Sequence, residues 1–242
     1  MRTLTKGYAM LSFKNVTRRF GTNTAVDSVG LDIPNGQMVG IMGGSGTGKS
    51  TLVKVLNGSL KHDAGSIYIN GHNLLTEKKE LEGMIGYIPQ DDLLIEELTV
   101  FQNLYFNAKL CLDGYSEEAL TERVNMILTD LDLFEVRELK VGSPLHKLIS
   151  GGQRKRLNIA LEIIREPYIL FVDEPTSGLS STDSENVMML LKELAMKGKL
   201  VVVNIHQPSS DLFKLFDQLE EQPCQYTGPG DSKFRCAQYL FG

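Results

Sequence analysis

The feature that most constrains this chain is a glycine-rich loop between two apolar segments. The loop Gly43–Ser50 has the spacing G-x-x-x-x-G-K-[ST], in which glycines let backbone N–H groups approach an anion closely. It follows Gln37–Met42, a short apolar run typical of a buried central strand, and precedes Ser50–Leu60, which has helical spacing. A helix that begins here directs its partial positive charge at the same anion. This context favours a phosphate-binding loop over a flexible Gly/Ser loop.

Each polar side chain of this loop has a predicted role. We expect Lys49 to reach the β- and γ-phosphates of a nucleotide, Ser50 to ligate Mg²⁺, and Thr51 to add a second phosphate contact. The predicted phosphate contacts are therefore Gly43, Gly44, Ser45, Gly46, Thr47, Gly48, Lys49, Ser50 and Thr51.

A pair of carboxylates follows a second apolar run. Asp173 and Glu174 come directly after Tyr168–Val172, which is typical of a parallel strand buried on both faces. Ligands bind beyond the carboxyl ends of such strands, so both side chains are expected to face the phosphate loop. We predict that Asp173 holds Mg²⁺ and that Glu174 is the base for the attacking water. A solvated acidic turn is the alternative.

The order of the remaining segments predicts an α/β fold. Met10–Ile33 alternates polar and apolar residues, as antiparallel strands do, and Ser66–Asn70 resembles an edge strand ended by an Asn–Gly turn. About 99–165 is mostly helical, with one apolar face at Val124, Ile127, Leu128 and Leu131. Val187–Met196 predicts a helix and Leu200–Ile205 another buried strand. Alternating strands and helices indicate a doubly wound, mostly parallel sheet into which the helical middle is inserted.

Composition limits the classes of partner. The chain has 242 residues, 42% of them hydrophobic, and a net charge of −5, so a nucleic acid partner is not expected. It contains no apolar run of 18 residues that could span a membrane. Its three cysteines, Cys111, Cys224 and Cys236, have no metal-like spacing and suggest reduced thiols.

Further motifs resemble those of one family, the ABC-type ATPases. Ser150–Gln153 (SGGQ) is similar to the signature motif of that family, Gln90 in YIPQDD to its Q-loop glutamine, and His206 in NIHQPSSD to its switch histidine. Together with the phosphate loop (Walker A) and Asp173–Glu174 (Walker B), these motifs occur in family order over about residues 11–217. The forms ISGGQRKR, DEPTSGL and IHQPSSDLFKLFD most resemble the G-subfamily of lipid, sterol and drug transporters and type-2 exporters.

The resemblance implies a P-loop NTPase fold, ATP and Mg²⁺ as ligands, and ATPase activity. One ABC ATPase domain would cover 1–242. About 11–87 and 166–217 would form a RecA-like core with an N-terminal antiparallel β subdomain, 88–165 an α-helical subdomain with the signature motif, and 218–242 an atypical tail.

The resemblance also implies roles for residues outside the loop. Gln90 would contact Mg²⁺ or the attacking water, and His206 the γ-phosphate. Phe20 would stack on adenine, with core packing as its alternative. Residues of the signature turn would contact ATP held by a second copy, namely Ser150, Gly151, Gly152 and Gln153. Ser150 is expected to cap the helix that follows.

Members of this family pair two ATPase domains head to tail, as a homodimer or heterodimer, with ATP between them. A transmembrane permease in another chain or in a further segment would place this domain at the cytoplasmic face of a membrane and make it the motor of transport, with export favoured. An isolated monomer should bind ATP well and hydrolyse it poorly. The alternatives are a soluble non-transport ABC ATPase and a regulatory nucleotide-binding module with little turnover.

The chain departs from the family in two places. Ser180 occupies the position where the D-loop usually has aspartate, which makes communication between paired sites less certain, and Gln218–Cys224 is charged, contains proline and predicts poor strand material. We expect a domain excerpted from a longer polypeptide. Two further sets are predicted at the surface: Arg154–Arg156 as a solvated helix face, and the histidines His62, His72 and His146.

Overall fold

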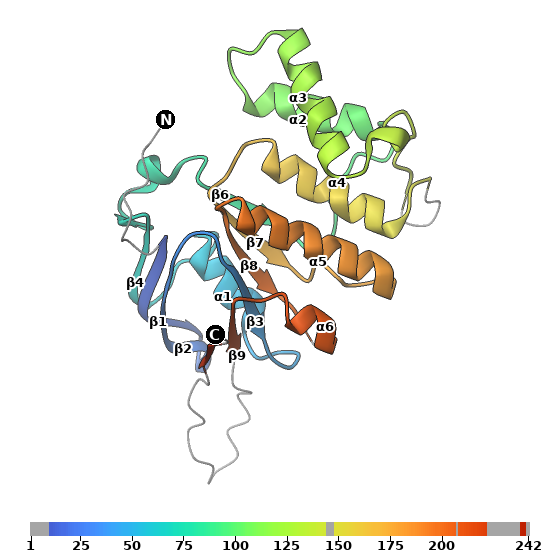
Figure 1. Cartoon of the computed structure of the whole chain (residues 1–242). Coiled ribbons are helices and arrows are strands. Elements are labelled where there is room, and N and C mark those ends of the chain that lie inside the picture. The colour runs from blue at the N-terminus through green and yellow to red at the C-terminus, as the bar shows by residue number, and fades with distance from the viewer. Residues whose placement is uncertain (1–9, 144–147, 207, 222–237, 241–242) are drawn as a thin grey trace.

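The computed structural model describes residues 10–143, 148–206, 208–221 and 238–240 as two sheets and a group of helices (Figure 1). The strands are β1 (Leu11–Phe20), β2 (Asn23–Ile33), β3 (Met38–Met42), β4 (Ala64–Ile69), β5 (His72–Asn73), β6 (Ile85–Ile88), β7 (Ile169–Asp173), β8 (Leu200–Asn204), β9 (Gln218–Glu221) and β10 (Gln238–Leu240). The helices are α1 (Lys49–Leu56), α2 (Val100–Cys111), α3 (Glu117–Asp130), α4 (Gly151–Ile163), α5 (Ser181–Met196) and α6 (Ser210–Phe213), with short 3₁₀ turns η1 (Lys78–Leu81) and η2 (Phe134–Val136).

The larger sheet has the strand order β10-β9-β3-β8-β7-β6, and all its neighbours pair in parallel except β10 with β9. Residues of β3, β7 and β8 are almost all buried, which explains their unbroken apolar sequences. The register sets Asp173 of β7 opposite Asn204 of β8, and Asn204 opposite Ile41 of β3. Three strand ends therefore meet beside the phosphate loop. This confirms the predicted α/β fold class.

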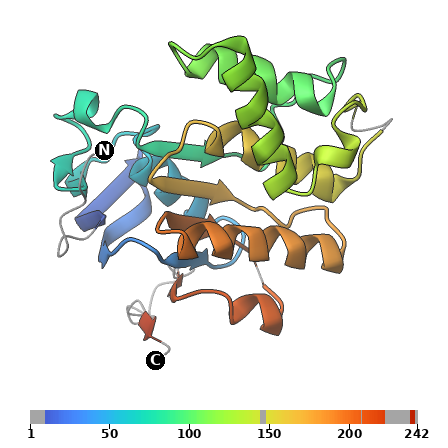
Figure 2. The ribbon, with the colours of Figure 1, turned by 45° about the horizontal axis from the view of Figure 1, so that its top comes forward.

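Two apolar layers cover the faces of this sheet. On one face, Val39, Ile41 and Phe171 pack with α1 and the smaller sheet, while on the other, Met38 and Leu170 pack with α5 and part of α4. Figure 2 shows α5 lying along the sheet. The alternation of side chains along each strand divides one sheet between these two layers. Among the described residues, no helix has both the length and the apolar character needed to cross a membrane.

The smaller sheet is antiparallel, with the order β2-β1-β4-β5. β1 and β2 form the hairpin predicted for Met10–Ile33. The expectation that Ser66–Asn70 is an edge strand was wrong, because β4 pairs with β1 on one side and with the two-residue β5 on the other. The predicted turn at Asn70–Gly71 returns the chain to form β5, and both residues have positive φ, at 50° and 83°.

The helical part, α2 to α4, has its own core. Val124, Ile127, Leu128 and Leu131 are all buried in it, as their spacing predicted. Figure 1 shows α2 and α3 above the sheets, with α4 between them and α5. Helix α4 thus contacts both this group and the layer on the larger sheet.

Among the strands of the larger sheet that lie near the site, β6 and β9 were not predicted. β6 was missed, and the expectation of poor strand material at Gln218–Cys224 was wrong for Gln218–Glu221, which forms β9. β9 lies beside β3, whose outer edge supplies backbone partners regardless of side-chain preference. Asp217 anchors its start, since its Oδ2 accepts from Met38 N at 2.8 Å and its Oδ1 from Lys192 Nζ at 2.7 Å. Cys224, Cys236 and His146 lie outside the described residues.

Candidate functional site

The phosphate loop folds around its own lysine. Lys49 is buried, and its Nζ donates to Gly43 O at 2.9 Å and to Gly44 O at 2.7 Å. Gly48, at the start of α1, has φ of 93°, and a Cβ there would overlap the carbonyl oxygen of Ala25 on β2. Only glycine fits this position, because it needs both the left-handed backbone and the close approach. The loop therefore presents an ammonium group and the start of a helix at one point.

A buried polar cluster lies beside the loop. Ser50 Oγ is 3.5 Å from Asp173 Oδ1, and Asn204 Nδ2 donates to Ser50 Oγ at 3.2 Å and also to Asp173 Oδ1. Asn204 is fully buried and Asp173 is 6% exposed. The predicted pair Ser50 and Asp173 is thus brought together, although 123 residues separate them.

Tyr87 completes this cluster from β6. Its hydroxyl donates to Asp173 Oδ2 at 3.3 Å. Burial, and then the neighbouring Asp173 carboxylate, raises the pKa of Tyr87 to about 12. The phenol therefore stays protonated near neutral pH and remains a donor.

Sequence reasoning missed both Asn204 and Tyr87. Asn204 is the polar residue that ends the apolar run of β8, the same signal that identified Asp173 at the end of β7. Tyr87 gave no such signal, since its strand was not predicted and its role depends on pairing of β6 with β7.

The oxygen atoms of this cluster suit Mg²⁺. Within the described residues, no group of three or more His, Cys, Asp or Glu could hold a metal by itself. Mg²⁺ needs no such cage, because it usually takes one or two protein ligands and completes its shell with water and phosphate oxygens. Ser50 and Asp173 supply one hydroxyl and one carboxylate, and Asn204 Oδ1 is buried without a hydrogen-bond partner in the described structure. The residues present fit the ion.

Glu174 follows Asp173 at the end of β7. Its backbone has φ of 43°, and its N–H donates to Asn204 O at 2.9 Å. A non-glycine residue in the left-handed region is uncommon, and such residues cluster at functional sites. The side chain is only half-buried, so it is open to water.

The other predicted catalytic residues follow neighbouring strand ends. Gln90 comes after β6 and His206 after β8, and both side chains are exposed. Gln90 Nε2 donates to Ser177 Oγ at 3.4 Å. Their placement agrees with roles at this edge of the sheet, and the roles themselves stay predictions.

Phe20 ends β1 and is 48% exposed, which excludes its alternative role in the core. The Arg18 guanidinium lies 4.7 Å from the ring centroid and also pairs with Asp63 at 3.0 Å. One expectation about histidines was wrong: His62 is 8% exposed and buried, whereas His72 is partly exposed beside Glu77. His62 lies in the short connection between α1 and β4.

The signature turn is a helix start. Ser150 Oγ accepts from Gln153 N at 3.1 Å, and Gln153 Oε1 accepts from Ser150 N at 2.8 Å. This reciprocal capping box confirms that Ser150 caps α4. Ser150 is exposed, so the turn is open to a ligand from outside the chain.

The expectation of a solvated basic face on α4 was wrong. Arg154 and Lys155 are 5% and 7% exposed, and the Arg156 side chain is 12% exposed. Arg154 and Lys155 are buried because acceptors from neighbouring segments surround them: Arg154 pairs with Asp92, and Lys155 Nζ donates to the carbonyls of Pro89 and Gln90. Desolvation lowers the pKa of Lys155.

Ser180 caps α5 at the D-loop position. Its Oγ accepts from Asp183 N at 3.1 Å and donates to Asp183 Oδ2 at 3.0 Å. Serine and aspartate are both good N-caps. The serine at this position therefore preserves the helix start.

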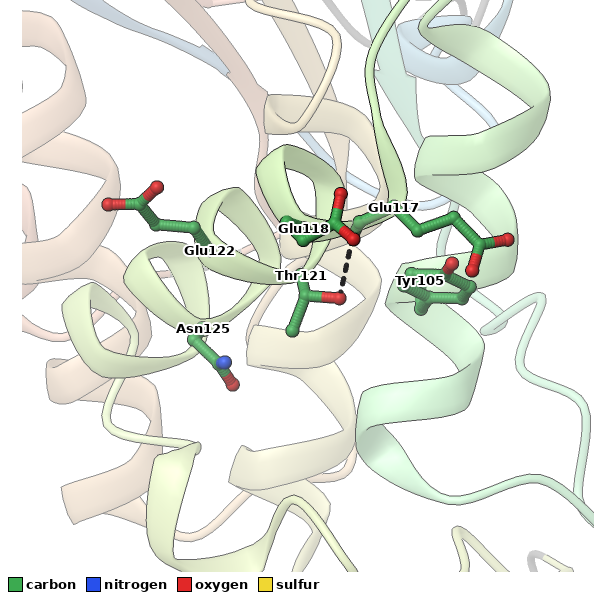
Figure 3. Close-up of a pocket in the computed structure, with 6 residues that line it drawn as sticks. All are labelled: Tyr105, Glu117, Glu118, Thr121, Glu122 and Asn125. Atoms are coloured by element: carbon green, nitrogen blue, oxygen red, sulfur yellow. Dashed lines mark hydrogen bonds between the residues drawn. The ribbon is translucent and has the colours of Figure 1, made fainter.

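A surface hollow between α2 and α3 lies apart from these residues. It is lined by Tyr105, Glu117, Glu118, Thr121, Glu122 and Asn125 (Figure 3). Thr121 Oγ1 donates to Glu117 O at 2.8 Å within α3. None of the predicted site residues lines it.

Known proteins resemble this chain over most of its length. The profile of a family described as ABC transporter matches residues 26–177. ABC transporter G family member 19 of Arabidopsis thaliana is 37% identical over 206 residues, which are 84% of this chain and 28% of that protein. The broad substrate specificity ATP-binding cassette transporter ABCG2 of Mus musculus is 38% identical over 232 residues, 90% of this chain and 35% of that one. The chain spans about a third or less of these relatives.

A solved structure agrees with the fold. It is the dimeric post-hydrolysis state of the ATP-binding cassette MJ0796 bound to ADP and Pi, with 30% identity and a TM-score of 0.73. The match covers 88% of this chain and 94% of that one.

Proposed function

This chain belongs to the ABC transporter family and is an ATP-hydrolysing domain of the P-loop type. From this we propose that the loop Gly43–Ser50 and Asp173 bind Mg·ATP and that Glu174 activates the attacking water. The observation that carries the proposal is the cluster of Ser50, Asp173 and Asn204 at the end of the phosphate loop. It joins a hydroxyl, a carboxylate and an amide where a helix start already favours anions.

The loop binds the triphosphate. Lys49 now donates to two carbonyls of its own loop, and its ammonium turns to the β- and γ-phosphate oxygens when ATP enters. Ser50 and Asp173 would hold Mg²⁺, which would supply positive charge to offset that of the phosphates. Tyr87 and Asn204 keep the Asp173 carboxylate oriented through hydrogen bonds to its two oxygens. Phe20 offers its exposed ring to adenine.

Water is activated at the ends of β6, β7 and β8. Glu174 accepts a proton from the attacking water, for which its half-buried carboxylate and anchored backbone N–H suit it. Gln90 orients that water or contacts the metal, and His206 contacts the γ-phosphate.

A second copy of the ATPase domain completes the site. The exposed cap Ser150 and the turn to Gln153 present a helix start to an anion outside the chain. The dimeric neighbour and the transporter relatives support a second ATPase domain as partner. We infer that the pair energises transport, with export favoured, through a permease in another chain or in further sequence at the cytoplasmic face of a membrane. ATP joins the two copies, and hydrolysis releases them.

The test is the variant Glu174→Gln, which keeps the size of the side chain and removes the base. It should bind Mg·ATP, lose at least about 100-fold in turnover, and accumulate as a dimer by light scattering. The matched control is Glu185→Gln, an exposed residue on α5, which should hydrolyse ATP normally. Hydrolysis by Glu174→Gln at the wild-type rate would remove Glu174 as the base.

The concentration dependence of the wild-type rate tests the dimer separately. Turnover per chain should rise with protein concentration if two copies form each site. A rate per chain that is constant over about a hundredfold range, with the protein monomeric throughout, would contradict the shared site and favour a module with little turnover.

A further inference from the structure

The first turn of α4 is bound to the segment that carries Gln90. This contact is important because, in the proposed function, the two elements act at different ATP sites. Gln90 acts at the chain's own ATP, while Ser150 and its turn act on ATP held by the second copy. The structure joins the two elements within a single chain through the basic residues that follow the signature turn.

Lys155 binds the backbone of the Gln90 segment. Its Nζ donates to Gln90 O at 2.9 Å and to Pro89 O at 3.2 Å, and the residue is 7% exposed. Backbone carbonyls are the acceptors here, so the contact fixes the path of the chain at Gln90 without using the Gln90 side chain, whose Nε2 donates to Ser177 Oγ. Its lowered pKa, caused by burial, shows the cost of holding an ammonium group at this place.

Arg154 binds the same segment two residues further on. Its Nε donates to Asp92 Oδ2 at 2.9 Å and its Nη2 to Asp92 Oδ1 at 3.0 Å, a two-bond pairing that fixes both position and orientation. Its Nη1 donates to Gly142 O at 2.6 Å and to Val141 O at 3.2 Å. The arginine side chain is 6% exposed and that of Asp92 is 25% exposed.

These contacts differ from exposed surface ion pairs, because forming them requires the desolvation of two buried cations. Burying a guanidinium and an ammonium within one helical turn carries a desolvation penalty, which hydrogen bonds of good geometry offset at best in part. Apolar residues of similar size would fill the same space without that penalty. What they would not supply is a fixed relation between α4 and residues 89–92.

We propose that Arg154, Lys155 and Asp92 are positioning residues that lock the Gln90 segment to the signature turn, so that both move as one unit. Engagement of Gln90 at a chain's own ATP and placement of Ser150 over the second copy's ATP are then one event. The lock gives the paired sites a route of communication that does not depend on the D-loop position, where Ser180 replaces the usual aspartate. The inference rests on the proposed function.

If the lock exists, variants that break it should weaken ATP-dependent dimerisation without weakening ATP binding. In the Glu174→Gln background, Arg154→Lys keeps the charge but loses the two-bond fork, and Asp92→Asn keeps the shape but loses the charge. Each should leave binding of radiolabelled ATP to the monomer within about twofold and weaken ATP-dependent dimerisation by about tenfold or more, as expected for one lost charge-assisted bond. Combining them should add little, because both break the same contact.

The matched control is Arg156→Lys, a basic residue on the same helix whose ion-pair contact is Asp132 rather than the Gln90 segment. It should dimerise as its parent does. Thermal melting of every variant shows whether it is folded, and if Asp92→Asn does not fold, Arg154→Lys carries the test. Folded lock variants that dimerise like the parent, or that lose ATP binding and dimerisation together, overturn the inference.

Failure of the proposed function would look different. In that case Glu174→Gln alone would not form an ATP-dependent dimer. The lock is then wrong as well, because its two elements would serve no paired site.

Discussion

Gly152, in the first turn of α4, packs so closely on α5 that no side chain fits. A Cβ at this position would overlap Asp183 Oδ1 and lie 2.7 Å from its Cγ. The carboxylate cannot easily turn away, because Ser180 Oγ donates to its Oδ2 at 3.0 Å. We therefore expect Gly152→Ala to push α4 and α5 apart or to break that hydrogen bond.

The magnitude follows from two opposing effects. Overpacking a close contact costs about 1–3 kcal/mol, whereas alanine regains up to about 1 kcal/mol over glycine in a helix. The free energy of unfolding should fall by about 1–2 kcal/mol, which lowers Tm by roughly 2–8 °C in a domain of this size. Urea denaturation of the nucleotide-free protein measures the free energy directly, without any contribution from ligand binding.

A double-mutant cycle tests the stated cause. Asp183→Ala alone loses the bond from Ser180 and an acidic residue in the first turn of α5, at about 1 kcal/mol. When the carboxylate of residue 183 is removed, the one that remains of the three nearest atoms is the Cβ of that residue, 3.1 Å from the Cβ added at position 152. Gly152→Ala should then change stability by less than about 0.5 kcal/mol.

The neighbouring Gly151→Ala is the control. Its Cβ would meet only the Leu179 Cδ2 methyl, at 3.2 Å, and that flexible end can move. If Gly152→Ala costs the same with and without the Asp183 carboxylate, or no more than Gly151→Ala, the clash is not the cause and the reasoning fails.

Three further predictions follow from single contacts. Gly48→Ala should abolish ATP binding in equilibrium dialysis, because it adds left-handed strain of about 1–2 kcal/mol to a clash with the Ala25 carbonyl; retained affinity would contradict this. Asn204→Ala should raise the Mg²⁺ concentration for half-maximal ATPase about 10- to 100-fold, because Asp173 loses a buried donor, while ATP binding in EDTA stays unchanged; an unaltered Mg²⁺ requirement would argue against that role. Burial raises the pKa of the Glu162 carboxyl. The protonated carboxyl therefore contributes stability below the unfolded pKa of about 4.3, and this contribution is lost as pH rises through the folded pKa. The urea midpoint of Glu162→Gln should accordingly rise relative to that of wild type between pH 4 and 7, and equal differences in midpoint throughout this range would refute the assignment.

The local sequence pattern was sufficient to predict those structural features and site residues that depend on neighbours in the sequence. The glycine loop, the apolar strand ending in Asp173, and the Ser150 cap are short-range features, because turns, caps and buried strands are encoded within a few residues of sequence. The sequence therefore predicted the α/β class, the antiparallel N-terminal strands and the inserted helices. It also indicated Ser50 and Asp173 as partners, and the structure places them together.

Pairing between distant segments decided the rest. Strand β9 has an unfavourable sequence and forms because the open edge of β3 offers backbone partners. The donors to Asp173 from Tyr87 and Asn204 exist because β6, β7 and β8 lie side by side. Only the sheet register, which no local periodicity encodes, sets these groups around one carboxylate.

The basic run after the signature turn shows the difference most clearly. From sequence alone, Arg154 and Lys155 have the composition of a solvated helix face. Their surroundings are made by Asp92 and the carbonyls near Gln90, which lie 62 and 65 residues away in the chain. The sequence determined that charges stand on this turn, and tertiary structure decided that they are buried, because desolvation depends on which acceptors folding brings within reach.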